Sequence, residues 1–126
     1  MMTISKRYTM SLSSGAISEL SVAVQLIEYG WAVAFPFTHA NNWDLIIHKE
    51  GVSYTVQIKG SEFSEYSKTV IKANWNNYSD VDWIILHDRI EQQFYIFKKG
   101  ELNNRRTLTL DPKKFSQNLN NWKRIK

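Results

Sequence analysis

Glu19 is a carboxylate placed among the apolar residues of a predicted helix. On a helical wheel of about 100° per residue, Glu19 falls between the main apolar arc and a flank formed by Val22 and Leu26. The main apolar arc comprises Ile17, Leu20, Ala23, Val24 and Ile27. Burying an ionised carboxylate without a partner is costly or forces its protonation. Glu19 therefore needs a cation, a basic group or a metal ion beside it, unless this flank is half covered and the carboxylate reaches water.

Asp44, Gln57 and Lys59 lie on either side of Glu50-Gly51, a turn sequence that favours a β-hairpin. If the loop holds two or four residues, the numbers of opposed positions add up to 101, and Asp44 faces Gln57. Gln57 and Lys59 are two positions apart, so they share that face of the hairpin. This register gathers a carboxylate, an amide oxygen and an ammonium group near one strand end. Taken alone, the pattern favours an ordinary polar sheet face with one Asp–Lys pair.

The apolar pattern predicts the elements that position these residues. Ser13 or Ser14 as the N-cap and Gly30 as the C′ residue delimit a predicted helix over 16–29. Strands are predicted over five segments: 31–35, 44–48, 54–59, 83–86 and 94–97. The polar stretch 61–80 contains a weakly alternating segment, 68–72, that suits an exposed strand or ribbon.

Pro112 suits the first position of a last helix, predicted over 111–121. This placement also explains Asp111-Pro112-Lys113 without an active site, because proline removes a hydrogen bond from a central strand. The element order is α-β-β-β-(ribbon)-β-β-α, which predicts an α/β or α+β sheet domain.

Composition limits the possible classes of protein. A chain of 126 residues, 43% hydrophobic and 22% charged, suits a single folded domain. The absence of cysteine excludes disulfides, thiolate metal sites and cysteine nucleophiles. The chain has no apolar run near the roughly 20 residues that span a bilayer, and no signal-peptide pattern. We therefore expect an intracellular, cytoplasmic and nucleoid-associated protein with no membrane partner.

Positive charge is concentrated in residues 98–126, which hold nine Lys or Arg against two Asp or Glu. The whole chain has a net charge of only +4. A basic block of this kind suits a polyanion, most simply a nucleic-acid backbone. The alternative is a solvated segment that keeps the protein soluble.

The helix with Glu19, the strand opened by Asp44 and the following Gln57-x-Lys59 resemble the PD-(D/E)XK nuclease superfamily. The strings GAISELSVAVQLIEYGWAVAFPF and NNWDLIIHKEGVSYTVQIKGS are similar to its small endonucleases. These include an intron-encoded homing endonuclease with a Gln-x-Lys site and, more distantly, archaeal Holliday-junction resolvases. The resemblance covers 15–61 and continues loosely over 83–97.

The resemblance implies a restriction-endonuclease-like core, with a mixed β-sheet flanked by helices. A single nuclease-like domain would span 1–126, with its core at about 13–98 and the basic segment at 98–126.

By position in the motif, the resemblance makes Glu19 the helix acid, Asp44 the central metal ligand, Gln57 a further ligand and Lys59 the catalytic lysine. Glu19, Asp44 and Gln57 would hold Mg²⁺, with Mn²⁺ able to take its place. The sequence departs from the superfamily pattern at two positions: Trp43 stands in place of the proline, and Gln57 replaces an acid. Because the neutral Gln57 lowers the negative charge of the site, the site could bind metal more weakly. The alternative is that the protein has lost its nuclease activity.

The implied activity is Mg²⁺-dependent DNA endonuclease activity with sequence-specific double-strand cleavage of the homing or restriction type. A structure-selective Holliday-junction resolvase is the first alternative, and a non-catalytic DNA-binding module is the second. One small domain carries one site, so cutting two strands implies a homodimer or a higher symmetric oligomer.

Three groups of residues are candidate DNA contacts. Asn41 and Asn42 precede Asp44 in a loop, and asparagine is common in loops regardless of function. In the polar stretch, Lys68, Lys72, Asn76 and Asn77 suit either base edges or an exposed connector. In the basic segment, the candidates for phosphate contacts are Arg105, Arg106, Lys113 and Lys114.

Overall fold

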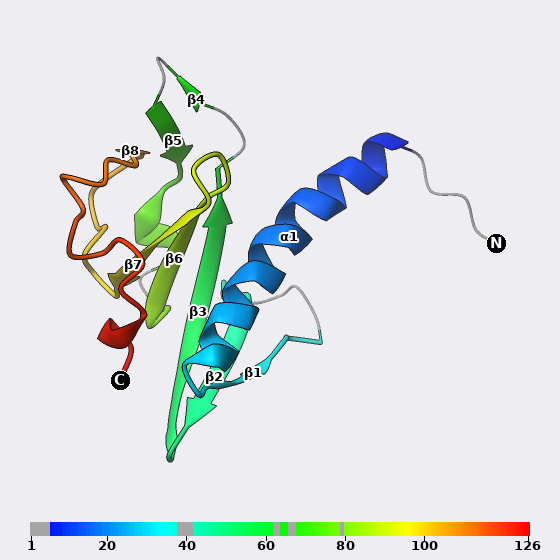
Figure 1. Ribbon diagram of the computed structural model, residues 1–126, viewed down its shortest axis with the longest axis vertical. Coiled ribbons are helices and arrows are strands. Elements are labelled where there is room, and N and C mark those ends of the chain that lie inside the picture. The colour runs from blue at the N-terminus through cyan, green and yellow to red at the C-terminus, as the bar shows by residue number, and fades with distance from the viewer. Residues whose placement is uncertain (1–5, 38–41, 62–63, 66–67, 79) are drawn as a thin grey trace.

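The computed structural model describes residues 6–37, 42–61, 64–65, 68–78 and 80–126. Its centre is a five-stranded mixed sheet with the order β1-β2-β3-β6-β7. The strands are β1 (Ala32–Ala34), β2 (Leu45–Lys49), β3 (Val52–Gly60), β6 (Trp83–Asp88) and β7 (Gln93–Lys98). Strands β3 and β6 run parallel, and the other neighbours are antiparallel. The helix α1 (Lys6–Glu28) crosses one face of this sheet (Figure 1). The predicted mixed sheet is therefore confirmed.

A smaller group of strands lies on the other side. It consists of β4 (Ser64–Glu65), β5 (Lys68–Lys72) and β8 (Thr107–Thr109), in that order. Two short 3₁₀ helices, η1 (Trp75–Tyr78) and η2 (Trp122–Arg124), complete the described elements. The ribbon predicted over 68–72 is thus a strand, and it pairs with residues of the basic C-terminal segment.

The hairpin has the predicted register. Strands β2 and β3 pair from Leu45 with Val56 to Lys49 with Val52. The loop holds two residues, Glu50 and Gly51, which both have positive φ, 51° and 82°. Positive φ at both central residues is the backbone of a type I′ turn, whose twist matches that of the strands. The pairing ends at Leu45 and Val56, and Asp44, just beyond it, donates its N–H to the Val56 carbonyl beside Gln57.

Helix α1 ends as predicted but begins earlier. Gly30 has a φ of 92°, and the N–H groups of Gly30 and Trp31 donate to Ile27 and Leu26 carbonyls at 3.0 Å each. This double closure is a Schellman motif with Gly30 at C′. The predicted N-cap at Ser13 or Ser14 is wrong, because the helix continues back to Lys6. No proline interrupts this stretch, and its N-terminal turns extend past the end of the sheet (Figure 1). Among the described residues, no helix is both long and apolar enough to cross a membrane.

The sheet-facing side of α1 differs from the main apolar arc of the sequence. Ser18, Val22 and Leu26 are almost fully buried, and Ala23 lies beside them. Four residues of the main arc instead remain 47–57% exposed: Ile17, Leu20, Val24 and Ile27. We call these four residues the α1 stripe. The flank that contained Glu19 is therefore the packed side, which directs this carboxylate to the edge of the sheet.

Each face of the sheet covers its own hydrophobic cluster. On the α1 side, the cluster includes Val56 and Ile58 of β3 together with residues of the C-terminal end. On the other side, Ile84 and Leu86 of β6 pack with residues that precede and follow β8. Gln57 and Lys59 are the register partners of Ile84 and Leu86, so they belong to the second face.

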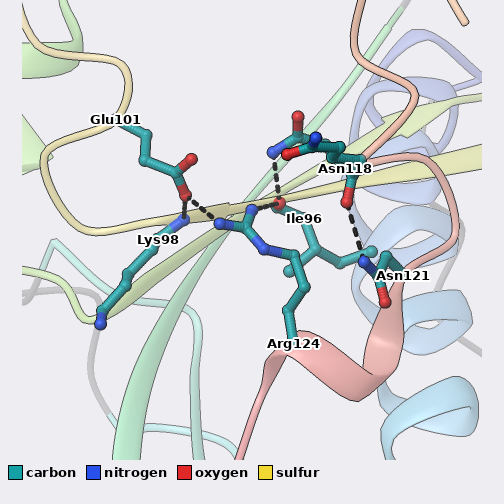
Figure 2. A network of polar contacts seen from close by, with 7 residues as sticks. Ile96, Lys98, Glu101, Asn118, Asn121 and Arg124 are labelled. Carbon is teal, nitrogen blue, oxygen red and sulfur yellow. Dashed lines mark hydrogen bonds and ion pairs between the residues drawn. The ribbon is translucent and has the colours of Figure 1, made fainter.

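The helix predicted over 111–121 is wrong. The segment forms successive turns, and the N–H of Asn120 donates to the Phe94 carbonyl at 2.7 Å. Figure 2 shows how this region is fixed: Asn118 and Arg124 both donate to the Ile96 carbonyl of β7, at 2.9 and 2.6 Å. Arg124 also forms an ion pair with Glu101 at 2.8 Å. The segment supplies hydrogen-bond partners for the backbone groups along the outer edge of β7, and a helix in its place would leave these groups unpaired. Within the described residues, a single α-helix therefore flanks the sheet.

Candidate active site

Asp44 lies where β2 separates from β3. Its N–H donates to the Val56 carbonyl at 2.8 Å, and its Oδ2 accepts the N–H of Ile58 at 2.8 Å. The carboxylate thus occupies the position at which a β2 carbonyl would continue the ladder. Beyond this point, no strand among the described residues pairs with β3 on the β2 side, and the fixed carboxylate lies at the start of this open edge.

Gln57 and Lys59 follow on β3, on the face opposite to α1. Gln57 is only 8% exposed, and its Nε2 donates a long hydrogen bond of 3.4 Å to the Ile58 carbonyl. Gln57 lines both cavities, and its Oε1 is the atom of this side chain that could bind a cation. Lys59 is half-buried, and its Nζ lies 5.4 Å from the centroid of the Tyr78 ring. The Tyr78 ring thereby limits where this ammonium group can lie.

Glu19 reaches the site because α1 approaches β3 very closely. The neighbouring Ser18 is buried, and its Oγ shares a hydrogen bond of 2.9 Å with Nδ1 of His87 on β6. A Cβ atom added to Gly60 would lie 2.4 Å from Ser18 Oγ. Only glycine at this position permits the observed distance between helix and strand.

His87 of β6 holds Ser18 in this contact. Its ring stacks on Phe94 with a centroid distance of 4.6 Å, and its side chain is almost completely buried. Burial lowers the pKa of His87, and the positive charge of Arg89 lowers it further. A neutral imidazole is therefore the form that pairs with Ser18.

The predicted catalytic residues meet in two adjoining cavities of about 280 and 230 Å³. Glu19, Asp44 and Gln57 line both cavities, and Lys59 lines the second. The first is completed by Phe35, Pro36, Asn42, Trp43 and Tyr78, and the second by Gly15, Ser18, Ile58, Gly60 and Arg89. The structure thus brings the four residues together, although their chemical roles stay predictions.

The donor set of these cavities fits a hard divalent cation. Glu19 and Asp44 supply carboxylates and Gln57 supplies an amide oxygen, the atom types that Mg²⁺ and Mn²⁺ prefer. No group of three or more His, Cys, Asp or Glu residues suited to a metal occurs in the described part of the chain. A metal site here would therefore depend on Gln57 as its third protein ligand.

The candidate DNA contacts do not form one group. Asn42 lines the first cavity and donates to the Asn77 carbonyl at 3.2 Å, so the loop of η1 lies beside the site. Asn76 accepts the N–H of Asn104 at 3.0 Å, which joins η1 to the segment before β8. In that segment, Arg105 and Arg106 are exposed, as is Lys72 on the neighbouring β5.

Of the remaining candidates, Lys113 lies apart from this group, Lys68 and Lys114 border it, and one lies outside the described structure. Lys113 lines a different cavity together with the acidic residues Asp88, Glu91 and Asp111, which makes it a poor phosphate contact. Lys114 is exposed, and its Nζ lies 5.5 Å from the Phe115 ring, the ring over which Arg105 also lies. Lys68 is the first residue of β5, and Asn41 lies outside the described residues.

Arg89 is a cavity residue that the sequence analysis did not select. It directly follows β6, which is the parallel neighbour of β3, so both strands end at the same edge of the sheet. The apolar segment 83–86 indicates a buried strand, but the sequence does not show that this strand runs parallel to β3. Knowledge of the strand order would have placed Arg89 beside Lys59.

The mixed sheet, and the gathering of Glu19, Asp44, Gln57 and Lys59 beside it, agree with what the resemblance to nucleases implies. The sequence model of the family described as PD-(D/E)XK endonuclease matches residues 10–124, so the chain belongs to this family. The structure is similar to that of a bacterial homing endonuclease, I-Ssp6803I, with a TM-score of 0.70 and 23% sequence identity. The match covers 77% of this chain and 72% of that chain. No curated protein sequence matches significantly. The predicted family and fold are confirmed.

Proposed function

We propose that this protein is a divalent-metal-dependent endonuclease that hydrolyses phosphodiester bonds in double-stranded DNA at specific sequences, as homing and restriction enzymes do. The observation that supports this most directly is the sharing of both cavities by Glu19, Asp44 and Gln57, with Lys59 at the second. Membership of an endonuclease family supports DNA as the substrate.

The chemistry follows from the side chains at the open edge of β3. Mg²⁺, when bound, supplies positive charge that polarises the phosphoryl group. Asp44, held by the Ile58 N–H, and Glu19 carry the negative charge that would retain the ion, and Gln57 adds a neutral oxygen. Lys59 provides an ammonium group that offsets the negative charge developing on the phosphate during attack by water.

The residues of η1 (Trp75–Tyr78) favour recognition of a DNA sequence over recognition of branched DNA. The contact between Asn42 and the Asn77 carbonyl holds η1 beside the first cavity. Asparagine side chains can pair with adenine edges in the major groove, and exposed lysines and arginines nearby suit the phosphates.

Cleavage assays with three substrates test the proposal. The protein is incubated with plasmid, with genomic DNA and with a synthetic four-way junction, each with Mg²⁺, with Mn²⁺ and with EDTA. We expect cleavage of duplex DNA at discrete sites with either metal ion and none with EDTA. Preferred cutting of the junction would favour the resolvase, and no cutting with any metal would support a non-catalytic DNA-binding module.

We propose that the α1 stripe forms the contact between two copies of the chain. Ile17, Leu20, Val24 and Ile27 are spaced by three, four and three residues, which is the a/d spacing of paired helices. The stripe contains no charged residue, and the same face on a second copy is self-complementary about a two-fold axis. A second copy would supply the second site needed to cut both strands.

Val24→Glu is expected to dissociate this dimer, because it buries a carboxylate at the centre of the apolar contact. Sedimentation equilibrium should give the dimer mass for the wild type and the monomer mass for Val24→Glu, and plasmid should then be nicked instead of linearised. Gln25→Glu introduces the same charge beside the stripe and should remain dimeric. A monomeric wild type that linearises plasmid would refute the proposed contact.

A further inference from the structure

Arg89 extends its side chain across the end of β3, beside the candidate active site. Its Cδ lies 3.4 Å from the position that a Cβ atom on Gly60 would occupy. Arg89 lines the second cavity together with Glu19, Asp44 and Lys59. The residue that directly follows β6 therefore lies next to Glu19 of α1, Asp44 at the start of β2 and Lys59 of β3.

The backbone around Arg89 is fixed on both sides. The N–H of Arg89 donates to Ser61 Oγ at 2.9 Å, and the Arg89 carbonyl accepts a hydrogen bond from Gln92 Nε2 at 2.7 Å. The carboxylate of Asp88 accepts the N–H groups of Ile90 and Glu91 at 3.1 and 3.0 Å. Because the turn is ordered before any ligand arrives, little backbone entropy would be lost when Arg89 binds one.

The side chain of Arg89 has no structural use comparable to that of Arg124. Arg124 is held by the Ile96 carbonyl and by Glu101, the one ion pair found among the residues that the structure describes. Arg89 forms no such ion pair within the described ranges, and the acid beside it, Asp88, is engaged by backbone N–H groups and by Thr69. A half-exposed arginine with a fixed backbone and open donors beside a catalytic cavity is arranged for an anionic ligand.

We propose that Arg89 forms a phosphate-binding site that grips the DNA backbone next to the bond to be cut. This inference rests on the proposed endonuclease function. The guanidinium group binds phosphate oxygens through two N–H donors, and thereby positions the neighbouring phosphodiester over the open edge of β3. Arg89 adds a contact from the parallel neighbour of β3 to a site otherwise built from α1, β2 and β3.

The test measures binding of a short duplex oligonucleotide as a function of salt, with Ca²⁺ in place of Mg²⁺. Each phosphate contact contributes about 0.9 to the slope of log K against log salt concentration. Arg89→Ala should reduce this slope by about one contact and slow single-turnover cleavage about tenfold or more, and Arg89→Lys should restore part of both. Lys49→Ala, which removes a cation at the far end of β2, outside both cavities and outside the basic segment, should leave slope and rate unchanged.

The outcomes separate this inference from the proposed function. Cleavage by the wild type with an unchanged slope for Arg89→Ala would overturn the phosphate site alone. A wild type that binds no DNA would overturn both. If Arg89 only pairs with Glu19, Arg89→Ala would change the Mg²⁺ concentration needed for cleavage and leave the slope intact, which also refutes the site. Thermal melting shows whether Arg89→Ala is folded; should it fail to fold, Arg89→Gln, which removes the charge but keeps a side chain of similar length, supplies the same slope test.

Discussion

Lys59→Ala is expected to reduce Mg²⁺-dependent DNA cleavage about a thousandfold while leaving the fold and duplex binding nearly unchanged. Removing a single group that stabilises charge in a transition state commonly costs this much in rate. The loss falls on the rate because the ammonium group acts on charge that develops during the reaction. Single-turnover cleavage at saturating Mg²⁺ measures it directly.

The structure gives reasons why this variant should keep its fold. Lys59 is half-buried, and the side-chain contact that the structure shows for it is with the Tyr78 ring, at 5.4 Å. Such a contact at a partly exposed position contributes about 0.5–1 kcal/mol. The backbone of Lys59 pairs with Leu86 whatever its side chain is.

A matched lysine on the same sheet provides the control. Lys98 ends β7, is exposed and lines neither cavity of the candidate site. Lys98→Ala should therefore cleave DNA at the wild-type rate. Melting curves and binding in Ca²⁺ establish that both variants are folded and bind duplex. Undiminished cutting by Lys59→Ala would show that the lysine has no catalytic role.

The strand pair of the candidate site could be predicted from the sequence because its determinants are local. Glu50-Gly51 sets a two-residue loop, and this loop sets the register that ends at Leu45 and Val56 and brings Asp44 and Gln57 to the same cavities. The Gly30 stop of α1 is local in the same sense, since it depends on the conformation that glycine permits after a helix.

Features that depend on distant parts of the chain could not be predicted in this way. Apolarity alone favoured the α1 stripe as the buried face, but the packed face is selected by the close approach of Ser18 to Gly60 and His87. Pro112 suggested a helix start, but the open edge of β7 binds the following residues instead. In both cases, a tertiary contact outweighs the local preference.

Gly60→Ala is expected to destabilise the protein by about 2 kcal/mol, in the range of substitutions that overpack a core. The added methyl group would lie 2.4 Å from Ser18 Oγ and 3.3 Å from Ser18 Cβ. Helix α1 must therefore move away from β3, which strains the hydrogen bond to His87 and displaces Glu19 from Asp44. Both the free energy of unfolding in urea and the cleavage rate should fall.

Gly15→Ala supplies the opposite control, because no atom lies within 4 Å of a Cβ atom added there. Gly15 lies inside α1, so alanine there should raise the free energy of unfolding by up to about 1 kcal/mol. A Gly60→Ala protein as stable and as active as the wild type would contradict the close packing of α1 on β3.

Ser18→Ala distinguishes a local clash at Gly60 from a general loss of packing. Alone, it removes the partner of Nδ1 on the buried His87 ring, whose Nε2 already has no partner among the described residues, and should cost about 1–3 kcal/mol. In the double variant Ser18→Ala/Gly60→Ala, the 2.4 Å contact no longer exists. The loss of stability of the double variant should therefore be smaller than the sum of the losses in the two single variants. Cleavage should recover along with stability, because Glu19 is carried by the same turn of α1. Strict additivity would mean that Ser18 and Gly60 do not jointly position the helix acid.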